Sequence, residues 1–500
     1  MPYLILFLVA LLWLQNYSSL DPDFGWHLSL GKEMIANKSL IHSFVGYNYF
    51  GNLHTIDHQW LSDILLYLIH YHVGYWFLAL IFFLITLTIF WLLYRLILLH
   101  KVHSTIAGLI IALSVLSASL VFYGVRLQYL LLLAAVLLPY IFKTVRPFWQ
   151  RLIYYFLIFA LGSNLHGGFL TLAPIPFLLE ISILKFDNEN RKKSFRQILY
   201  LILILIAAFS TNPYGIEYWK FIIGYWTSPY YRSHISEWLP ITAFPLHWAQ
   251  VIFPLSITIF LITIDKYWKK INKFKLALLA LYLYLGITSL RAFPIFILLA
   301  APYIAVALQN LLASLKLNVS NAKYFLIAFV LIISVCWMAG MRKIDFRTSV
   351  FDADHSYPEN ALSYLSENIS ESGNLLNDYG WGGYQIWTHP ELKVFIDGRN
   401  PIPFVDGKKS MLEVYDNFYY GSDEKLANNL TKYNISTVMM NKPVVYRLNK
   451  AETLLYINLG GLNLNDLNKA PDLIKYLDSN SNWKRIYTDD HAYIWQRLEQ

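Results

Sequence analysis

The run YWFLALIFFLITLTIFWLLY at residues 75–94 is the part of the sequence that decides the fold. No residue in this run carries a charged side chain. A transmembrane helix needs about 20 mostly apolar residues to cross the hydrocarbon core of a bilayer. The run therefore predicts a membrane-spanning helix.

Similar apolar runs recur on both sides of it. Of the 500 residues, 56% are apolar and 14% are charged, whereas soluble proteins have about 25% charged residues. We expect about eleven transmembrane helices, near residues 3–20, 75–94, 104–122, 127–142, 152–165, 168–184, 197–211, 248–264, 276–290, 292–313 and 324–341. This pattern excludes an ordinary soluble protein and predicts a polytopic α-helical membrane protein.

Basic residues alternate between rich and poor loops along these expected helices. The rich loops contain Arg95, Lys101, Lys143, Arg146, Arg151, Lys185, Arg191, Lys192, Lys193, Arg196, Lys266, Lys269, Lys270, Lys273, Lys275, Lys316 and Lys323. The poor loops contain Lys32, Lys38, Arg126, Lys220, Arg232 and Arg291. By the positive-inside rule the N-terminus is cytoplasmic, and the residues after 341 are external. The net charge of +8 thus reflects membrane topology and indicates no nucleic-acid partner.

The last 159 residues differ in composition, with 17 Lys and Arg and 21 Asp and Glu. Segments 436–445 and 393–399 are predicted to be strands, and 483–497 is predicted to be a strand pair joined by a turn. Segment 357–369 is predicted to be a helix that begins at a proline. We therefore expect a transmembrane domain over 1–341, with a first external loop at 21–59, and a soluble external α/β domain over 342–500.

Unusual polar residues concentrate in the expected external loops. The first of these loops opens with DPDFGWHLSLGKEMI at 21–35, where the segment from Asp23 can form an amphipathic helix at the membrane surface. Asp21 and Asp23 can cap that helix. Alternatively, one carboxylate activates a hydroxyl group as a general base, or the pair holds a divalent cation.

Metal binding elsewhere has weaker support. The segment HTIDH places His54 and His58 four residues apart, a spacing that can ligate a metal on a helix, although no third ligand is evident. An interfacial histidine with ordinary hydrogen bonds is the favoured interpretation. The single cysteine, Cys336, excludes an intramolecular disulfide and a cysteine-built metal site.

Two arginines, Arg126 and Arg291, each stand at the external end of an expected helix. They can extend toward lipid headgroups, or they can bind a lipid-linked phosphate, whose geometry suits the guanidinium group. The segment NLHGGF at 164–169 brings Asn164 and His166 to another external helix start. Its glycines would let a ligand approach the backbone amides closely.

Together these motifs resemble the C-type multi-span glycosyltransferases (GT-C superfamily). That superfamily includes the catalytic subunits of oligosaccharyltransferases, protein O-mannosyltransferases and aminoarabinose transferases. The similarity is greatest to a bacterial branch with a DPDxxWHLxxG opening. The matching motifs are DPDFGWHLSLG at 21–31, HQWL at 58–61, RLQ at 126–128, NLHGGF at 164–169, NPYG at 212–215, EW at 237–238, DYGWGGYQIW at 378–387 and FIDGR at 395–399.

The resemblance implies transfer of a sugar from a polyprenyl-phosphate or -diphosphate donor to an envelope acceptor, with inversion, at the external face of the inner or plasma membrane. It assigns the role of base or metal ligand to Asp23, which we favour, or to Asp21, with Mg or Mn as the candidate metal. Donor-phosphate contacts would be Arg126, His166 and Arg291. Substrate contacts would be His27, His58, Asn164, Glu237, Asp378 and Tyr379. We expect Asp23 and the three donor-phosphate residues to converge on one external cavity.

Three features of the C-terminal motifs qualify the resemblance. DYG at 378–380 is similar to the acceptor motif WWDYG of oligosaccharyltransferases, but Leu376 and Asn377 replace the paired tryptophans, which argues against N-glycosylation of sequons. Asp397 and Arg399 are expected to form an ion pair inside the domain. Trp381 and Tyr384 would either stack on sugar or pack inside the protein.

Two other functions are compatible with the sequence. A transporter or flippase of lipid-linked sugars would also be polytopic, but such proteins often carry inverted repeats, and none is found here. Glu180 is the main acidic residue well inside an expected helix. A non-catalytic relative that keeps only the fold is the second alternative.

Overall fold

The computed structural model describes residues 2–16, 21–43, 46–49, 54–118, 124–240, 272–316, 357–368, 373–399, 404–405, 409–443 and 468–498. The chain forms two compact units. Unit 1 comprises Met1–Ser19, Tyr75–Ile216 and Arg232–Asp345. Unit 2 comprises Leu20–Gly74, Glu217–Tyr231 and Phe346–Gln500. Unit 2 thus combines the first expected external loop with the C-terminal part of the chain, and the division into domains 1–341 and 342–500 stays a prediction.

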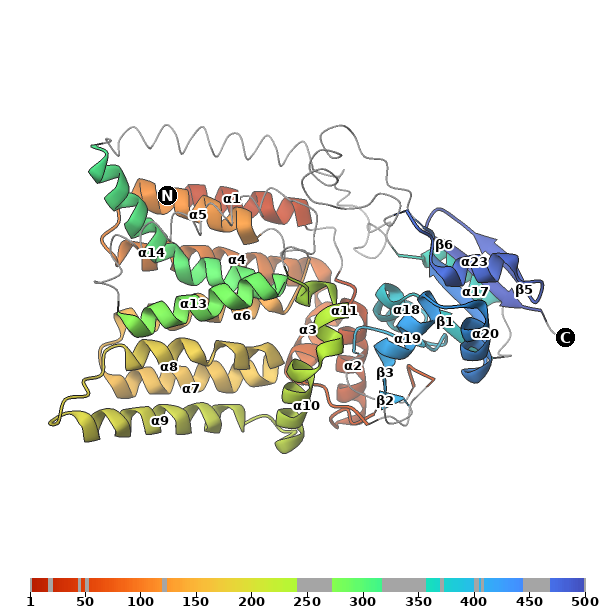
Figure 1. Cartoon of the computed structure of the whole chain (residues 1–500), viewed down its shortest axis with the longest axis horizontal. Coiled ribbons are helices and arrows are strands. Elements are labelled where there is room, and N and C mark those ends of the chain that lie inside the picture. The colour runs from red at the N-terminus through yellow and green to blue at the C-terminus, as the bar shows by residue number, and fades with distance from the viewer. Residues whose placement is uncertain are drawn as a thin grey trace. The chain divides into compact units, whose positions relative to one another are not determined.

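Unit 1 is a bundle of helices that run alongside one another in Figure 1. Its helices are α1 (Pro2–Asn16), α4 (Tyr75–Leu98), α5 (Ser104–Ala118), α6 (Gln128–Thr144), α7 (Phe148–Leu165), α8 (Pro174–Ile181), α9 (Arg191–Phe209), α13 (Lys273–Thr288) and α14 (Phe293–Ser314). Short 3₁₀ helices follow or precede them, namely η1 (Gly167–Leu172), η2 (Ser236–Trp238) and η5 (Leu290–Ala292). Helices α10 (Ile216–Thr227) and α11 (Pro229–His234) cross the boundaries between the units.

Helices occupy all of the expected spans that fall within the described residues; the spans 248–264 and 324–341 lie outside them. Within the described part of the chain, two helices are long and apolar enough to cross a membrane, Tyr75–Leu98 and Leu290–Ser314. Shorter apolar helices cover Tyr3–Trp13, Ser104–Val115, Gln128–Thr144 and Gly167–Ile181. The helical character is therefore found, while the count of eleven spans stays a prediction.

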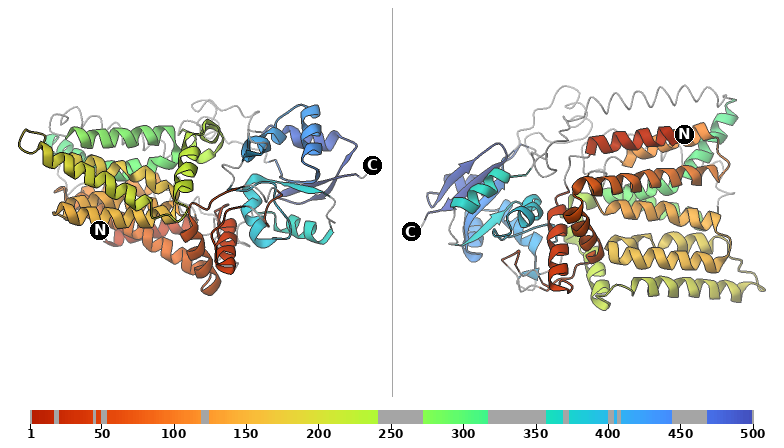
Figure 2. Two further views of the ribbon diagram at one scale, coloured as in Figure 1. Left: turned by 90° about the horizontal axis from the view of Figure 1, so that it is seen from below. Right: turned by 180° about the vertical axis from the view of Figure 1, so that it is seen from behind.

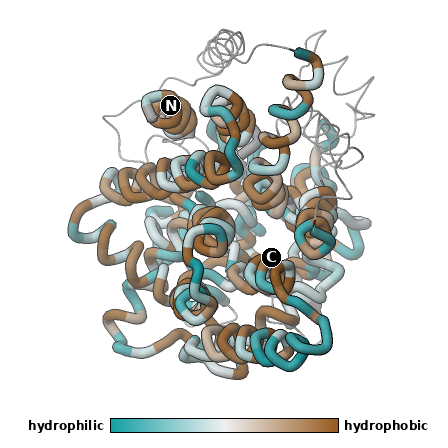
Figure 3. Tube along the Cα trace, turned by 90° about the vertical axis from the view of Figure 1, so that its left-hand side faces the viewer, coloured by the Kyte–Doolittle hydropathy of each residue, from teal (hydrophilic) through white to brown (hydrophobic). Residues whose placement is uncertain are grey.

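Helices α7 and α9 expose large apolar side chains. Leu157 and Leu161 on α7 are exposed, as are Leu199 and Leu203 on α9. Because residues four apart share one face of a helix, each pair forms an apolar stripe. The helices of unit 1 accordingly show long brown stretches in Figure 3. Apolar surface of this kind marks a site of membrane or protein contact.

The core of unit 2 is a four-stranded sheet in the order β1-β4-β6-β5, visible from two sides in Figure 2. Its strands are β1 (Asn374–Asn377), β4 (Ile435–Asn441), β5 (Trp483–Thr488) and β6 (Ala492–Arg497). Strands β1 and β4 are parallel, and Val438 of β4 pairs with Trp495 of the antiparallel β6. A second, two-stranded sheet pairs β2 (Phe404–Val405) with β3 (Lys409–Ser410).

Helices complete unit 2. They are α2 (Phe24–Asn37), α3 (Trp60–His72), α17 (Glu359–Asn368), η6 (Tyr379–Trp381), α18 (Gly382–Thr388), α19 (Met411–Tyr419), α20 (Asp423–Lys432) and α23 (Asp472–Ser479). Helix α20 begins at an N-cap serine, a residue type that is typical of this position. The Ser422 hydroxyl accepts a hydrogen bond from the amide of Lys425. Helix α2 packs against both α3 and α18.

Several predicted elements of unit 2 are confirmed. Strand β4 begins one residue before the predicted segment, the pair β5 and β6 is antiparallel, and α17 lies inside 357–369. The strand predicted at 393–399 is wrong. Only Val394 forms an isolated bridge there, with Asn48, because the following amides bind the side chain of Asn377 instead of a neighbouring strand.

The prediction for the start of the first external loop is half right. Residues 24–37 form a helix, but its first two turns are buried on every side, from Phe24 through Gly31. An amphipathic surface helix would bury only one face. Helix α2 is therefore an internal element of the protein.

Candidate functional site

Four side chains from distant segments of unit 1 form one polar cluster, the Arg126–Arg291 cluster, which consists of Arg126, His166, Glu237 and Arg291. An Arg126 Nη2 proton is donated to Glu237 Oε1. Arg291 Nη1 lies 3.7 Å from Glu237 Oε2, and Arg291 Nη2 lies 3.0 Å from His166 Nε2. Unit 1 contains five of the predicted donor-phosphate and substrate contacts, and the fold brings these four together.

Short segments at helix ends hold the members of this cluster. Arg126 precedes α6, and its carbonyl accepts the amide of Tyr129 at 3.2 Å. His166 ends α7, where its amide donates to the carbonyl of Gly162. Glu237 lies in η2 and Arg291 in η5. Because all four residues stand where a helix begins or ends, their side chains can meet without interrupting the helical hydrogen bonds.

The histidine of the cluster is fixed in one tautomer. The amide of Gly168 donates to His166 Nδ1 at 2.8 Å, so Nδ1 carries no proton. In neutral imidazole the proton then resides on Nε2. The Nε2 proton and the Arg291 guanidinium, a group that can only donate, therefore face each other at 3.0 Å. Two donors that face each other at this distance repel, so an anion that binds beside them and accepts from both would relieve the repulsion.

The charges of the cluster also favour an anion. Two guanidinium groups and one carboxylate leave an excess of positive charge when His166 is neutral. Arg126 and His166 are each about 6% exposed, so water shields them little. The side chains of Glu237 and Arg291 are 23% and 28% exposed. The cluster is thus a mostly buried cationic site that solvent reaches at Glu237 and Arg291.

Asn164 lies beside this cluster in sequence but serves the packing of α7 on α9. Its Nδ2 donates to the carbonyl of Ala160 at 2.8 Å and to Thr211 Oγ1 at 3.3 Å. Asn212 of the NPYG motif donates from Nδ2 to the carbonyl of Ser163 at 2.8 Å. These amides satisfy backbone groups at the end of α7 and connect it to the end of α9.

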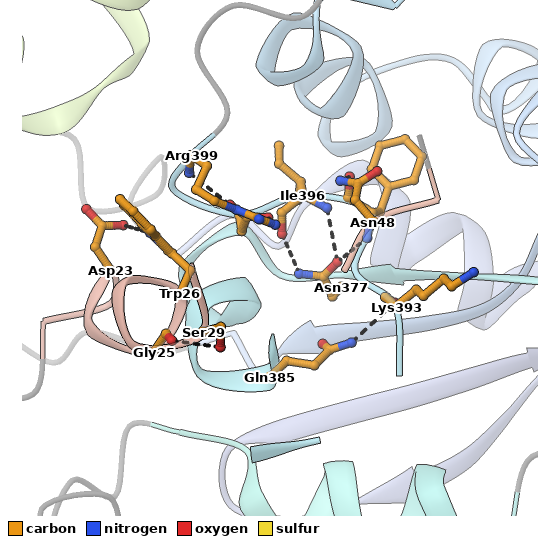
Figure 4. Close-up of polar contacts among 12 residues, drawn as sticks. Asp23, Gly25, Trp26, Ser29, Asn48, Asn377, Gln385, Lys393, Ile396 and Arg399 are labelled. Atoms are coloured by element: carbon orange, nitrogen blue, oxygen red, sulfur yellow. Dashed lines mark hydrogen bonds and ion pairs between the residues drawn. The ribbon is translucent and has the colours of Figure 1, made fainter. Parts of the chain in front are cut away.

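In unit 2, the two acidic residues of the DPD motif have different partners. Asp21 is buried, and its Oδ1 accepts the amide of Asp23 at 3.1 Å. Asp23 Oδ1 accepts the indole proton of Trp26 at 2.9 Å, as Figure 4 shows. Asp23 occupies the N-cap position of α2 without a capping hydrogen bond from its side chain. Neither carboxylate therefore acts mainly as a helix cap.

Three sequence motifs of unit 2 meet at glycines. A Cβ atom on Gly25 would overlap the carbonyl oxygen of Gly383, and a Cβ on Gly383 would overlap that of Pro22. A Cβ on Gly398 would overlap Asp23 Oδ1. The absent side chains let α2, α18 and the segment after Val394 approach to backbone contact. The DPDFGW, WGGY and FIDGR motifs thus form one packed structure around Asp23.

Asn377 completes this structure at the end of β1. Its Oδ1 accepts the amide of Phe395 at 2.8 Å, and its Nδ2 donates to the carbonyl of Ile396 at 2.8 Å (Figure 4). Asp397 and Arg399 form the expected internal ion pair, with Arg399 Nη2 2.6 Å from Asp397 Oδ2. Asn377 stands where the similar WWDYG motif has a tryptophan. Its side-chain oxygen accepts backbone amides, which a tryptophan side chain cannot do.

A second buried polar group of unit 2 joins the predicted substrate contact His27 to Asp57 and to Asp63, which was not predicted. His27 Nδ1 lies 2.6 Å from Asp63 Oδ1, and Asp57 is buried beside Asp63. Burial raises the pKa of Asp57 well above its ordinary value, and the charge of Asp63 raises it further. Burial likewise raises the pKa of Asp63. Both shifts favour the protonated form, and we assign the proton to Asp57, because the Asp63 carboxylate faces His27. The only sequence signal was a lone acidic residue inside LSDILLYL.

The remaining predicted contacts in unit 2 have internal partners. The His58 ring stacks on Phe221, with ring centroids 5.1 Å apart. Asp378 accepts the Tyr419 hydroxyl at 2.9 Å and the amide of Gly380 at 3.0 Å, and burial raises its pKa. The amide of Tyr379 donates to the Tyr415 hydroxyl. Trp381 and Tyr384 are both buried, which agrees with a packing role.

The described residues do not provide the ligand set of a metal site. None of them forms a group of three or more His, Cys, Asp or Glu side chains that could hold a metal ion. Around Asp23, one oxygen is used by Trp26 and lies against Gly398. His54 and His58 are not helical, and His54 Nε2 lies 3.6 Å from Glu217 Oε2. The donors present in this part of the chain do not fit a metal centre.

The expected convergence of Asp23 with the donor-phosphate residues concerns both units. Arg126, His166 and Arg291 lie together in unit 1, and Asp23 belongs to unit 2. Convergence of the four residues therefore stays a prediction.

No protein-family model matches the sequence, and no curated protein matches it. Solved structures match in fold. The chain is similar to the oligosaccharyltransferase of Archaeoglobus fulgidus tethered to an acceptor peptide with the NVT sequon, with a TM-score of 0.50 and 12% identity over 99% of this chain and 74% of that chain. It is also similar to AglB of the same organism in complex with an inhibitory peptide and a dolichol-phosphate, with a TM-score of 0.52 and 12% identity over 88% and 69% of the two chains. At 12% identity this similarity shows a shared fold and nothing more. The fold agrees with the resemblance to GT-C enzymes that the sequence motifs indicate.

Proposed function

We propose that this protein is a membrane glycosyltransferase that moves a sugar from a polyprenyl-phosphate or -diphosphate donor to an acceptor of the cell envelope. The fold supports this class, because a protein of the same fold holds a dolichol-phosphate. Fold alone does not define function. The choice of reaction therefore rests on the chemistry of the Arg126–Arg291 cluster.

The opposed donors of His166 and Arg291 carry the proposal. A sugar leaves its lipid carrier when the bond between C1 and the phosphate oxygen breaks, and negative charge develops on that oxygen. Fixed donors aimed at developing charge are among the strongest catalytic devices that proteins have. In this proposal the His166 Nε2 proton and the Arg291 guanidinium both donate to the phosphate. Arg126 adds positive charge from its buried position.

The acceptor side of the reaction is assigned to Asp23. The acceptor hydroxyl attacks C1 from the face opposite the phosphate, its proton passes to the Asp23 carboxylate, and the configuration at C1 inverts. The Trp26 indole fixes the orientation of this carboxylate through its hydrogen bond to Oδ1. A divalent cation is implied by the resemblance, but no step is assigned to it, because the described donors do not fit one.

Membrane location belongs to the same proposal. The apolar stripes of α7 and α9 would face lipid. In this proposal the N-terminus lies in the cytoplasm, as the basic loops favour, and unit 2 lies outside the cell or in the periplasm. The lipid phosphate would then reach the cluster from the external leaflet.

A transfer assay tests the proposal. Purified full-length protein is incubated with labelled polyprenyl-phosphate sugars and a cell-envelope acceptor extract, and product formation is measured with and without Mg²⁺. We expect transfer by the wild type, a loss of about 100-fold or more in kcat for Arg291→Ala, and a comparable loss for Asp23→Asn. Arg232→Ala is the matched control, because Arg232 is exposed on α11 outside the cluster.

The outcomes separate the candidate functions. Absence of transfer with every lipid donor, in protein that is folded and monodisperse, contradicts a glycosyltransferase. Movement of the intact lipid-linked sugar across a proteoliposome membrane without transfer would establish the flippase instead. Full activity of Asp23→Asn would remove Asp23 from the mechanism and leave the phosphate site unaffected.

A further inference from the structure

Glu237 is the one acidic member of the Arg126–Arg291 cluster, and it contacts both arginines. Its carboxylate lies where a phosphate bound to the two guanidinium groups would have to place its oxygens. We propose that Glu237 is an exchangeable counter-ion, which a lipid-linked phosphate replaces when it binds. This inference rests on the proposed function, since it names the event by which the donor enters the site.

The backbone around Glu237 is held independently of its carboxylate. The Ser289 hydroxyl donates to the carbonyl of Glu237 at 3.3 Å, and the amide of Leu290 donates to the carbonyl of Leu239 at 2.9 Å. These bonds connect η2 to the segment that begins η5. The side chain can therefore leave the arginines by rotation about its own bonds while the two short helices stay in place.

The two arginines differ in how strongly each depends on a neighbouring anion. Arg126 is nearly buried, and a buried charge without a partner is strongly destabilising. It needs an anion at every stage of a binding cycle. Arg291 is more exposed and lies farther from the carboxylate, at 3.7 Å. An incoming phosphate can therefore engage Arg291 and His166 first, and Glu237 can release Arg126 as the phosphate reaches it.

A phosphate fits this exchange better than the carboxylate does. A carboxylate offers two oxygens in one plane, whereas a phosphate offers non-bridging oxygens in a tetrahedral arrangement. One of these oxygens can accept from His166 Nε2 while the others accept from the two arginines. The exchange thus fills the site with an anion of larger charge and more acceptors.

Binding measurements with Glu237→Gln test the exchange. The variant keeps the size of the side chain and removes its charge, so the phosphate no longer competes with an internal anion. We expect the Kd of a short-chain polyprenyl phosphate, measured with the full-length protein in nanodiscs, to fall about threefold to tenfold relative to wild type. Inorganic phosphate, tested separately, should show the same direction if the phosphate group alone drives exchange, and no change if the lipid-anchored form is required.

Glu217→Gln is the matched control, because Glu217 is an exposed acid outside the cluster and its substitution should leave both Kd values unchanged. Weaker or unchanged lipid-phosphate binding by Glu237→Gln overturns the counter-ion role. If Glu237→Gln does not fold, Glu237→Asp serves, since its shorter carboxylate should loosen the contact with Arg126 and still lower the Kd; a raised Kd would overturn the role.

The same measurements keep the two proposals apart. Failure of the wild type to bind any polyprenyl phosphate contradicts the proposed function itself. Binding by the wild type that Arg291→Ala abolishes, combined with no gain in Glu237→Gln, supports the phosphate site and refutes the exchange alone.

Discussion

Gly383 and Gly380 stand three residues apart, yet they meet very different surroundings. A Cβ on Gly383 would overlap the carbonyl oxygen of Pro22, whereas a Cβ on Gly380 would have Asp378 Oδ1 as its nearest neighbour at 3.6 Å. Because the first contact involves backbone, Gly383→Ala must separate α18 from the start of α2. We expect a loss of about 2–3 kcal/mol in the free energy of unfolding, measured as a lower unfolding temperature of the detergent-solubilised protein.

Gly380→Ala is the control for that variant and should change the unfolding temperature little, because its Cβ meets only ordinary van der Waals contact. Equal stability of the two variants would show that the DPD and WGGY motifs do not pack in backbone contact. Since Asp23 lies in the same structure, Gly383→Ala should also lower transfer activity.

The buried Asp57–Asp63 pair predicts a dependence of stability on pH. Burial raises the pKa of both groups in the folded protein, whereas the pKa of an aspartate in the unfolded chain is about 3.9. As the pH rises from about 4 toward the raised values, the unfolded chain releases a proton that the folded chain keeps. Stability contributed by this pair is therefore highest at and below about pH 4 and falls as the pH rises through the raised pKa values.

Two substitutions separate the roles of these carboxyl groups. Asp57→Asn keeps a neutral donor toward Asp63, so we expect unchanged or higher stability at pH 7 and a flatter pH profile. Asp63→Asn removes the anion that faces His27 at 2.6 Å, so we expect a loss of about 3 kcal/mol. Unfolding temperatures from pH 4 to 9 measure both. An Asp57→Asn variant that is as unstable as Asp63→Asn would contradict the assignment of the proton to Asp57.

Residues with unusual chemistry are easier to recognise in the sequence than the partners that they contact in the fold. Arg126, Arg291 and His166 were singled out because apolar packing could not explain them at helix ends. The tautomer of His166 could not be predicted, since it depends on the amide of Gly168. Asp63 was missed, because only the packing of α3 against α2 brings it to His27.

At the scale of elements, α7 and α8 are connected by a buried ion pair. Arg151 donates from Nε to Glu180 Oε1 at 2.5 Å and from Nη2 to Oε2 at 2.7 Å, and the Tyr155 hydroxyl donates to Oε1 at 2.9 Å. Removing one partner leaves the other charge buried and unpaired. We expect Arg151→Met to cost about 3–5 kcal/mol, seen as a lower unfolding temperature in detergent.

A double-mutant cycle checks that this cost is electrostatic. Arg151→Met combined with Glu180→Leu removes both charges, so its cost should be well below the sum of the single costs. Arg191→Met, in the first turn of α9, serves as a control, because the Arg191 guanidinium stacks on Phe195 at an exposed position. Additive costs in the cycle would show that Glu180 does not depend on Arg151.

Elements were predictable where one local pattern governs them. Long apolar runs gave the helices of unit 1, and alternating residues around a turn gave β5 and β6. The segment 393–399 has the composition of a strand, but its amides bind Asn377, a residue 18 positions away from Phe395. A window of neighbouring residues carries no information on such a partner, which is why that prediction failed.

At the scale of the whole molecule, the chain segments that make up unit 2 limit how many times the chain can cross the membrane between them. Unit 2 contains Leu20–Gly74, Glu217–Tyr231 and Phe346–Gln500. If this unit lies on one side of the membrane, the chain between 74 and 217 must cross an even number of times, and so must the chain between 231 and 346. The expected spans number six and four in these two stretches, and the span at 3–20 makes eleven. The parity therefore agrees with the expected count.

Cysteine labelling tests this topology directly, because Cys336 is the single cysteine and its replacement by serine gives a cysteine-free chain. Asn37→Cys on α2 and Ser479→Cys on α23 place exposed thiols on two segments of unit 2 that are far apart in sequence. Asn188→Cys places an exposed thiol between α8 and α9, in a basic loop. In intact spheroplasts a membrane-impermeant maleimide should label the first two thiols, and it should label Asn188→Cys only after permeabilisation.

Labelling of Asn188→Cys alone would show that the sidedness is the reverse of the predicted one. Labelling of Ser479→Cys without Asn37→Cys would separate the two segments of unit 2 across the membrane and break the parity argument, since an odd number of crossings would then have to lie between them.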